Sequence, residues 1–439
     1  MGLASAKIFN FAKRINSLMI SPGKAAEESR WTGVHYLLFA AFSIGTTIEA
    51  YIYSLSYIAT GWVAVPRVLL ALLAVWSPLW LLIGGIVAGP LSDHIGRKNT
   101  LFITLALYAV GAVGLIFSYT YAALLISIAL LLFSSGGEYN TILAATHELF
   151  PKKHRGTALF LELNFTNIGG SIAAVLSLLE ISSVFYQRVV LGITLLLSVL
   201  VMFVIRLKVP ESVLWLESKG KIDRAQEELL KYYKAAPAKD DLKKPQRVPP
   251  LWLRLFVGGA VGWAYTAGFS LIVLTLGPYF FPSLTDWLIL VFGLVAFASG
   301  FVGLIADRVS RRSMLLFSSI AVIITAFLFI PTLNIWLHNI AVFWALFVAV
   351  SVFINIYFLA EDTLKSEIWP SKRRGLYTAI VRVISLGGSV PVLFLTANLP
   401  ILEYMWVGIA IFFVGFVASL IWFFFGIETS RGMSVRIWD

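Results

Sequence analysis

Twelve apolar stretches follow one another along the chain and leave little sequence for anything else. A helix of about 20 apolar residues spans the hydrocarbon core of a bilayer, and a spanning segment must satisfy its backbone polar groups internally. The sequence therefore predicts an all-α membrane protein with twelve transmembrane helices, at 33–59, 67–90, 99–119, 121–147, 156–180, 184–207, 252–280, 286–306, 313–333, 339–364, 376–398 and 403–427.

The basic residues indicate how the helices are oriented. If the chain crosses the membrane twelve times, 31 of its 34 Lys and Arg residues lie in segments on one side of the membrane. Arg67 and Arg188 lie on the other side. Arg382 is the one basic residue expected inside a helix. The positive-inside rule then puts both termini and the central loop in the cytoplasm of a multi-pass cell-membrane protein. The net charge of +11 follows from this distribution and does not indicate a nucleic-acid partner.

Two loop motifs occur twice, each time about half a chain apart. The stretch from Gly89 to Lys98 returns around Asp307, which lies 214 residues after Asp93. Likewise, Glu148-x-x-Pro-x-x-x-Arg155-Gly returns as Glu367-x-x-Pro-x-x-x-Arg374-Gly. A repeat of this length indicates two pseudo-symmetric six-helix halves, as in many transporters.

The domain boundaries follow from this repeat. We expect an N-terminal half at 1–208, including a cytoplasmic segment at 1–32, and a C-terminal half at 251–439 with a cytoplasmic tail at 428–439. Between them, 209–250 is expected to be a cytoplasmic linker with an amphipathic helix.

Two of the acidic residues inside predicted helices are candidates for carrying a proton. A charge at the centre of a spanning helix costs about 2.5–3.5 kcal/mol on insertion scales, so such a group should face a cavity or a partner. Glu49 lies near the middle of the first helix and Glu138 follows two glycines in the fourth. Both are candidates for proton coupling; the alternative for each is a structural hydrogen bond to another helix.

Arg382 needs a negative partner, because a guanidinium does not lose its charge. Either it contacts an anionic substrate or it pairs with Glu361 or Asp362 of the tenth helix. The other candidates for substrate binding are polar or aromatic residues of the spans, namely Asn164, Tyr51, Asn355, Tyr357 and Trp263.

The repeated motifs resemble those of the major facilitator superfamily. Gly136-Gly137-Glu138, Pro210-Glu211-Ser212 and Glu428-Thr429-Ser430 are similar to stretches of its sugar-porter and metabolite:proton symporter branch. The resemblance implies the major facilitator fold. It also implies gating roles for the charged loop residues Asp93, Arg97, Glu148, Arg155, Asp307, Arg311, Glu367 and Arg374.

Some residues depart from the sugar-porter pattern. Val213 and Leu214 replace the Pro and Arg of that branch, and its pair of glutamines in the seventh helix is absent. Glu49-Ala50-Tyr51 is instead similar to the Asp-Ala-Tyr of phosphate:proton symporters. We therefore expect a small organic anion as the first choice of substrate, with phosphate or a sugar as the alternative.

The functional expectation is a monomeric, proton-coupled secondary transporter that works by alternating access in the lipid bilayer. No nucleotide-binding loop, cofactor motif or metal cluster is found in the sequence, so an enzyme is not expected. A uniporter or exporter of the same fold is an alternative, and a non-transporting membrane receptor is an alternative of another class.

Overall fold

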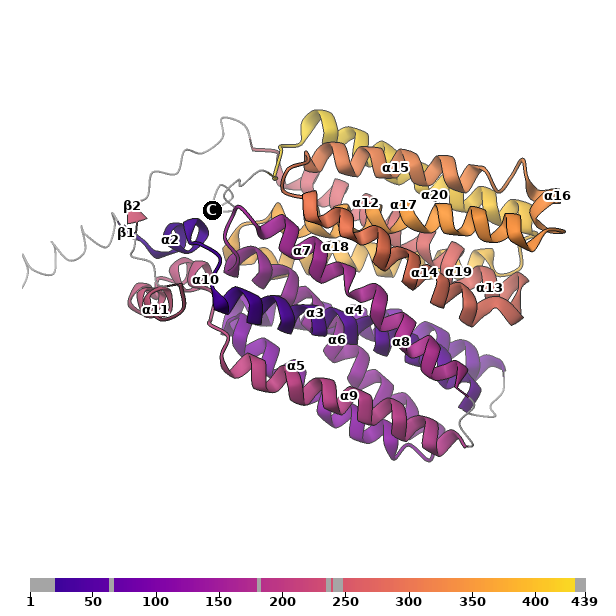
Figure 1. Cartoon of the computed structure of the whole chain (residues 1–439), viewed down its shortest axis with the longest axis horizontal. Helices are drawn as coiled ribbons and strands as arrows, with labels where there is room; N and C mark the ends of the chain where they lie inside the picture. Colours follow the sequence, from indigo (N-terminus) through magenta and orange to yellow (C-terminus); the bar gives the residue numbers. More distant parts are fainter. Residues whose placement is uncertain (1–19, 63–66, 180–182, 234–237, 240–247, 431–439) are drawn as a thin grey trace, which may run out of the picture.

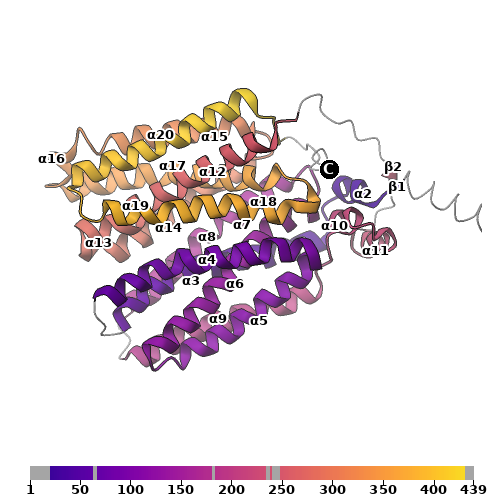
Figure 2. The same cartoon turned by 180° about the vertical axis from the view of Figure 1, so that it is seen from behind.

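The helices form two bundles that lie side by side (Figures 1 and 2). The structure is a computed structural model that describes residues 20–62, 67–179, 183–233, 238–239 and 248–430. The predicted N-terminal segment before residue 20 and the tail from 431 onward lie outside the described residues.

The first bundle, here called the N half, consists of the helices between Gly33 and Leu207. They are α3 (Gly33–Ile58), α4 (Arg67–Ile95), α5 (Arg97–Ile116), α6 (Tyr121–Leu149), α7 (Arg155–Asn164), α8 (Thr166–Leu178) and α9 (Val184–Leu207). Hydroxyl side chains cap the N-termini of two of these helices. Thr120 caps α6 and Ser183 caps α9, each by accepting a hydrogen bond from a backbone N–H.

The second bundle, the C half, consists of the helices between Leu251 and Phe425. They are α12 (Leu251–Phe269), η3 (Ser270–Thr275), α13 (Leu276–Phe280), α14 (Thr285–Ser299), η5 (Gly300–Ile305), α15 (Arg311–Phe327), α16 (Leu333–Trp336), α17 (Ile340–Glu367), α18 (Arg374–Arg382), η7 (Val383–Gly387), α19 (Gly388–Thr396) and α20 (Ile401–Phe425).

Eleven segments of the described chain are long and apolar enough to cross a membrane. The remaining predicted span is α15, which has 17 residues and continues into a turn. Several spans are interrupted: α7 and α8 meet at Phe165, and π-helical turns lie within the seventh span (η3) and the eleventh (η7). Such turns occur often at functional sites.

Short helices lie at one end of the molecule, next to the N half (Figure 1). They are α2 (Pro22–Glu28), α10 (Val213–Ser218) and α11 (Ile222–Glu228), which continues into η2 (Leu229–Tyr233). We call this end of the molecule the capped end; it is the end that the charge distribution predicts to be cytoplasmic. The only sheet in the described chain is the antiparallel pair β1 (Ile20–Ser21) and β2 (Ala238–Lys239).

The linker helix lies where the sequence predicts one. Ala225, Leu229 and Tyr233 are buried, whereas Leu230 is exposed. The sequence gives no sign of α2 and α10, because six or seven residues are too few to show a helical period. The domain boundaries themselves stay a prediction.

Candidate functional site

A cavity lies between the two halves, in the middle of the spans. Its wall comes from α3, α4, α6 and α8 of the N half and from α12, η3, α14, α17, α18 and η7 of the C half. Its surface is mainly apolar and aromatic, and it also carries five charged side chains and several hydroxyl and amide groups. This composition is typical of a binding site for a small molecule.

An ion pair crosses the cavity from one half to the other. Arg382, the last residue of α18, donates a hydrogen bond to Glu49 in the middle of α3. Each side chain is 9% exposed. The Arg382 guanidinium also lies 4.2 Å from the centroid of the Tyr139 ring of α6, within the range of a cation–π contact. Arg382 is therefore held entirely by groups of the N half.

A second charged cluster lies on α17 at the same cavity. Lys365 Nζ lies 3.1 Å from Glu361 Oε1 and also forms an ion pair with Asp362. The Tyr139 hydroxyl of the N half donates to Asp362. Glu361 and Asp362 are thus the partners of Lys365 and not of Arg382. Lys365, which the charge count placed in a loop, is buried in the cavity wall.

These groups do not balance in charge. Glu49, Glu361 and Asp362 supply three carboxylates, whereas Arg382 and Lys365 supply two cations. With every group ionised, this set has one negative charge in excess. Because uncompensated charge is costly at membrane depth, the cavity favours the uptake of one positive charge, such as a proton.

Aromatic rings form much of the remaining wall. Tyr265 stacks on Phe358 at a centroid distance of 4.8 Å and on Phe269 at 5.7 Å. Hydroxyl and amide groups lie among them, from Thr166, Asn167, Ser270 and Ser385. The wall therefore combines flat apolar surfaces with neutral hydrogen-bonding groups.

Glu138 does not line the cavity. It is buried within the N half, where it forms an ion pair with Arg206 of α9 and accepts from Thr104 Oγ1 at 2.6 Å. Arg206, which the charge count assigned to the flank of the linker, is the last basic residue of α9 and also donates to Leu101 O at 2.6 Å. The statement that Arg382 is the one basic residue inside a helix is therefore wrong.

The other predicted substrate-binding residues lie behind the cavity wall. Tyr51 donates to Leu191 O at 3.1 Å inside the N half, and Trp263 donates to Gly388 O at 2.8 Å inside the C half. The remaining members of this set, which are Asn164, Asn355 and Tyr357, are buried and do not line the cavity either.

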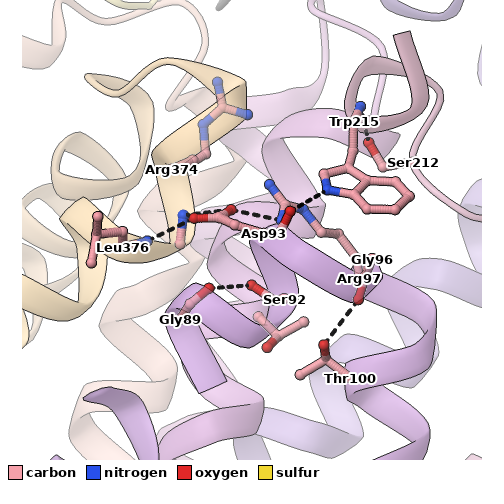
Figure 3. Close-up of polar contacts among 12 residues, drawn as sticks. Gly89, Ser92, Asp93, Gly96, Arg97, Thr100, Ser212, Trp215, Arg374 and Leu376 are labelled. Carbon is pink, nitrogen blue, oxygen red and sulfur yellow. Dashed lines mark hydrogen bonds and ion pairs between the residues drawn. The ribbon is translucent and has the colours of Figure 1, made fainter. Parts of the chain in front are cut away.

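The repeated motifs meet at the capped end (Figure 3). The Asp93 carboxylate of α4 accepts from the backbone N–H groups of Gly375 at 3.3 Å and Leu376 at 3.0 Å, in the first turn of α18. Arg97 binds Asp93 at 2.8 Å and Glu148 at 2.8 Å. A carboxylate at a helix N-terminus is favoured by the helix dipole, so Asp93 joins the N half to the C half.

Arg374 adds a second contact between the halves. It lies 2.9 Å from Glu148 Oε1, so that Glu148 binds one arginine from each half. Beside it the backbones of α4 and α18 nearly touch, because a Cβ on Gly375 would lie 2.5 Å from Gly89 O. Only glycine permits this approach.

The second copy of the motif forms the equivalent contact with the two halves exchanged. Asp307 of the C half accepts from Gly156 N at 3.0 Å and Thr157 N at 2.7 Å, in the first turn of α7. Arg311 pairs with Glu367 at 3.1 Å. Arg155, however, pairs with Glu27 of α2 at 3.0 Å, so it holds the N-terminal segment.

Linker and tail residues complete this network. Ser212 donates to Glu148 Oε2 at 2.7 Å, and Trp215 Nε1 donates to Asp93 O at 2.9 Å. In the tail, Glu428 accepts from Arg311 N at 2.8 Å. Burial would raise the pKa of Glu428, but hydrogen bonds from the Ser310 hydroxyl and from backbone N–H groups of Ser430 and Arg311 hold it below its usual value.

The fold and the site together define a membrane transporter of the major facilitator class. A model of the sugar (and other) transporter family matches residues 42–433. The chain belongs to this family, whose members are transporters and not enzymes.

Curated relatives are similar over differing lengths. The glucose transporter GlcP of Staphylococcus epidermidis is 25% identical over 393 residues, which is 81% of this chain and 85% of that protein. The facilitated trehalose transporter Tret1 of Culex quinquefasciatus is 27% identical and covers 56% of this chain and 52% of its own. The niacin transporter NiaP of Acinetobacter baylyi is 29% identical over a third of each chain.

Solved structures share the fold. The proton:xylose symporter XylE bound to 6-bromo-6-deoxy-D-glucose superposes with a TM-score of 0.73 at 17% identity, covering 92% of this chain and 99% of that chain. At this identity the likeness establishes the fold, and it confirms the twelve-helix prediction.

Proposed function

We propose that this protein carries a sugar, or a closely related neutral polar metabolite, across the membrane by alternating access, together with a proton. The observation that carries this proposal is the Glu49–Arg382 ion pair, which joins the two halves inside the cavity. The two halves would rock about this site, as in other transporters built from repeats.

The organic anion expected from the sequence is not supported by the relatives, and the cavity offers it no free cation. Arg382 pairs with Glu49, and Lys365 is shared by two carboxylates. An anion would add to a set of groups that already has an excess negative charge. Phosphate meets the same objection. The sugar alternative suits the aromatic and neutral polar wall, and GlcP and Tret1 are named as sugar transporters.

The proposed coupling follows from the charge of Glu49. Protonation of Glu49 would remove the ion pair that joins α3 to α18, and the halves would then separate more easily. A transporter is coupled only if proton and substrate bias its two states differently, and a charged contact between the halves meets this requirement. Glu138 remains a predicted coupling residue, but its position off the cavity makes Glu49 our first choice.

The experiment is proton entry into dye-loaded proteoliposomes on addition of sugars, carboxylates and phosphate. We expect acidification with a sugar and no acidification with Glu49→Gln, which should still exchange labelled for unlabelled sugar. Glu138→Gln is the matched control, because Glu138 is also buried and paired with an arginine but lies off the cavity.

Three other results would change the proposal. Acidification with a carboxylate alone would restore the organic anion. Sugar flux without proton movement would indicate a uniporter. Sugar binding without flux would indicate a receptor. Cytoplasmic termini, location in the cell membrane and a monomeric state stay predictions.

A further inference from the structure

Three asparagines from both halves form a hydrogen-bonded cluster beside the cavity. Asn164 and Asn167 belong to α7 and α8 of the N half, and Asn355 belongs to α17 of the C half. Of the three, only Asn167 lines the cavity, and it is 8% exposed. The cluster is therefore a polar contact between the halves with one member facing the site.

Backbone carbonyls of the C half set the direction of two of these amides. Asn355 Nδ2 donates to Ala296 O at 2.7 Å, and Asn164 Nδ2 donates to Phe297 O at 2.9 Å. A backbone carbonyl can only accept a hydrogen bond. Both amides must therefore present their NH₂ groups to α14, which leaves both Oδ1 atoms facing Asn167.

The remaining contacts agree with these orientations. Ser299 donates its hydroxyl hydrogen to Ala296 O at 2.9 Å, so it can accept from Asn355 Nδ2 at 3.1 Å. A Cβ on Gly300 would lie 1.8 Å from Asn164 Oδ1. Asn164 thus packs directly on the backbone of η5, with no room to turn over.

The orientation of Asn167 follows from that of its neighbours. Its Nδ2 donates to Asn164 Oδ1 at 3.1 Å and to Asn355 Oδ1 at 2.9 Å. An amide NH₂ has two hydrogens, and both are used. The Oδ1 atom of Asn167 meets no donor within the described part of the chain, so Asn167 offers the cavity a fixed acceptor.

We propose that Asn167 Oδ1 accepts a hydrogen bond from one hydroxyl group of the transported sugar and so determines which sugars bind. This inference rests on the proposed function, because it takes a neutral polyhydroxyl substrate as given. Asn164 and Asn355 are positioning residues: they act through Asn167 and do not touch the substrate. Since Asn355, Ala296 and Phe297 belong to the C half, the acceptor is oriented only while the halves are closed at the capped end.

The test measures binding of the transported sugar and its monodeoxy analogues to the purified full-length protein. In the wild type, one deoxy analogue should bind about tenfold more weakly than the parent, which is the effect of one hydrogen bond to a buried acceptor. Asn167→Ala should bind the parent about tenfold more weakly and bind the parent and that analogue equally. The other analogues should keep their wild-type ranking.

Two further variants separate this role from a structural one. Asn355→Ala does not alter the cavity wall but frees the Asn167 amide to turn over, so it should also reduce discrimination against that one analogue. Ser171→Ala is the matched control, because Ser171 lies one turn further along α8, donates to Asn167 O and does not line the cavity. It should keep the full wild-type profile.

The outcomes distinguish this inference from the proposed function. If Asn167→Ala binds the parent sugar with wild-type affinity and keeps the wild-type analogue profile, the role of Asn167 is overturned and the proposed function stands. If the wild type binds no sugar, the proposed substrate class and this inference fail together. A loss of binding that is equal for all analogues in Asn167→Ala would show a structural role and overturn the inference.

Discussion

At the residue scale, the structure separates buried charges that serve the cavity from those that hold a bundle together. Glu49 and Glu138 look alike in the sequence, since each lies within an apolar helix. The structure pairs Glu49 with an arginine of the opposite half and Glu138 with an arginine of its own half. When the halves rock, the contact between Glu49 and Arg382 changes and the contact between Glu138 and Arg206 does not. Only Glu49 can therefore couple to transport through its ion pair.

Glu138→Gln should therefore affect stability and leave coupling unchanged. Breaking a buried pair by removing one charge costs about 3–5 kcal/mol, and Arg206 would lose its partner. We expect a lower unfolding temperature in detergent but the wild-type ratio of protons to sugar in proteoliposomes. A changed ratio would return Glu138 to the coupling mechanism, as the sequence predicted.

Lys365 should be required for stability because it neutralises two buried carboxylates. Lys365→Met would leave Glu361 and Asp362 unpaired, and we expect a loss of about 3–5 kcal/mol in the free energy of unfolding. The double variant Lys365→Met with Asp362→Asn removes one charge of each sign and should recover most of it. The measurement is thermal unfolding in detergent, with the exposed Lys153→Met as control. A double variant no more stable than the single one would contradict this account.

At the element scale, the long helices were predictable and the side-chain directions were not. Apolar stretches of this length have no stable form in a bilayer except a helix, which is why the twelve spans could be read from the sequence. Tyr51 and Tyr357, however, lie on long, mainly apolar helices whose few polar residues do not form a continuous face. No polar face then shows which residues meet the cavity, and the structure places both behind its wall.

The ends of helices were the other source of error. Arg206 and Lys365 lie in the last turns of α9 and α17 and were counted as loop residues. Each is buried against a carboxylate of a neighbouring turn or helix. The predicted tenth helix ends at 364, before Lys365, whereas the true helix continues to Glu367. Arg206 lies inside the predicted helix at 184–207, but the charge count grouped it with the linker that follows.

The short helix α2 should depend on one buried ion pair. Glu27 is buried against Arg155, whereas the adjacent Glu28 is exposed and pairs with Lys152. Glu27→Gln should raise the hydrogen-exchange rate of α2 about 100-fold, since the loss of a buried pair exceeds about 3 kcal/mol. Glu28→Gln should change it by fivefold at most, as expected for about 0–1 kcal/mol. Equal effects of the two variants would show that the pair with Arg155 does not hold α2.

At the scale of the whole molecule, two related contacts close the capped end. Asp93 of the N half caps α18 of the C half, and Asp307 of the C half caps α7 of the N half. The repeat in the sequence predicted two related halves, and the structure shows that each copy of the motif binds the other half. A hydrogen bond to a charged group contributes about 1.5–3 kcal/mol, so neither contact alone prevents opening.

Loss of either aspartate should therefore shift the protein toward a state that is open at the capped end. Asp93→Asn and Asp307→Asn should each change the ratio of open to closed molecules by about tenfold or more.

The chain contains no cysteine, so spin labels can be attached to Lys153→Cys in the N half and Lys372→Cys in the C half without removing native thiols. Both positions are exposed. Double electron–electron resonance should show a longer distance population that grows in both variants and does not grow in Asp223→Asn, a substitution of an exposed residue of α11. If only one aspartate had this effect, the two copies of the motif would no longer be equivalent in closing the molecule, and the halves would open about an asymmetric hinge.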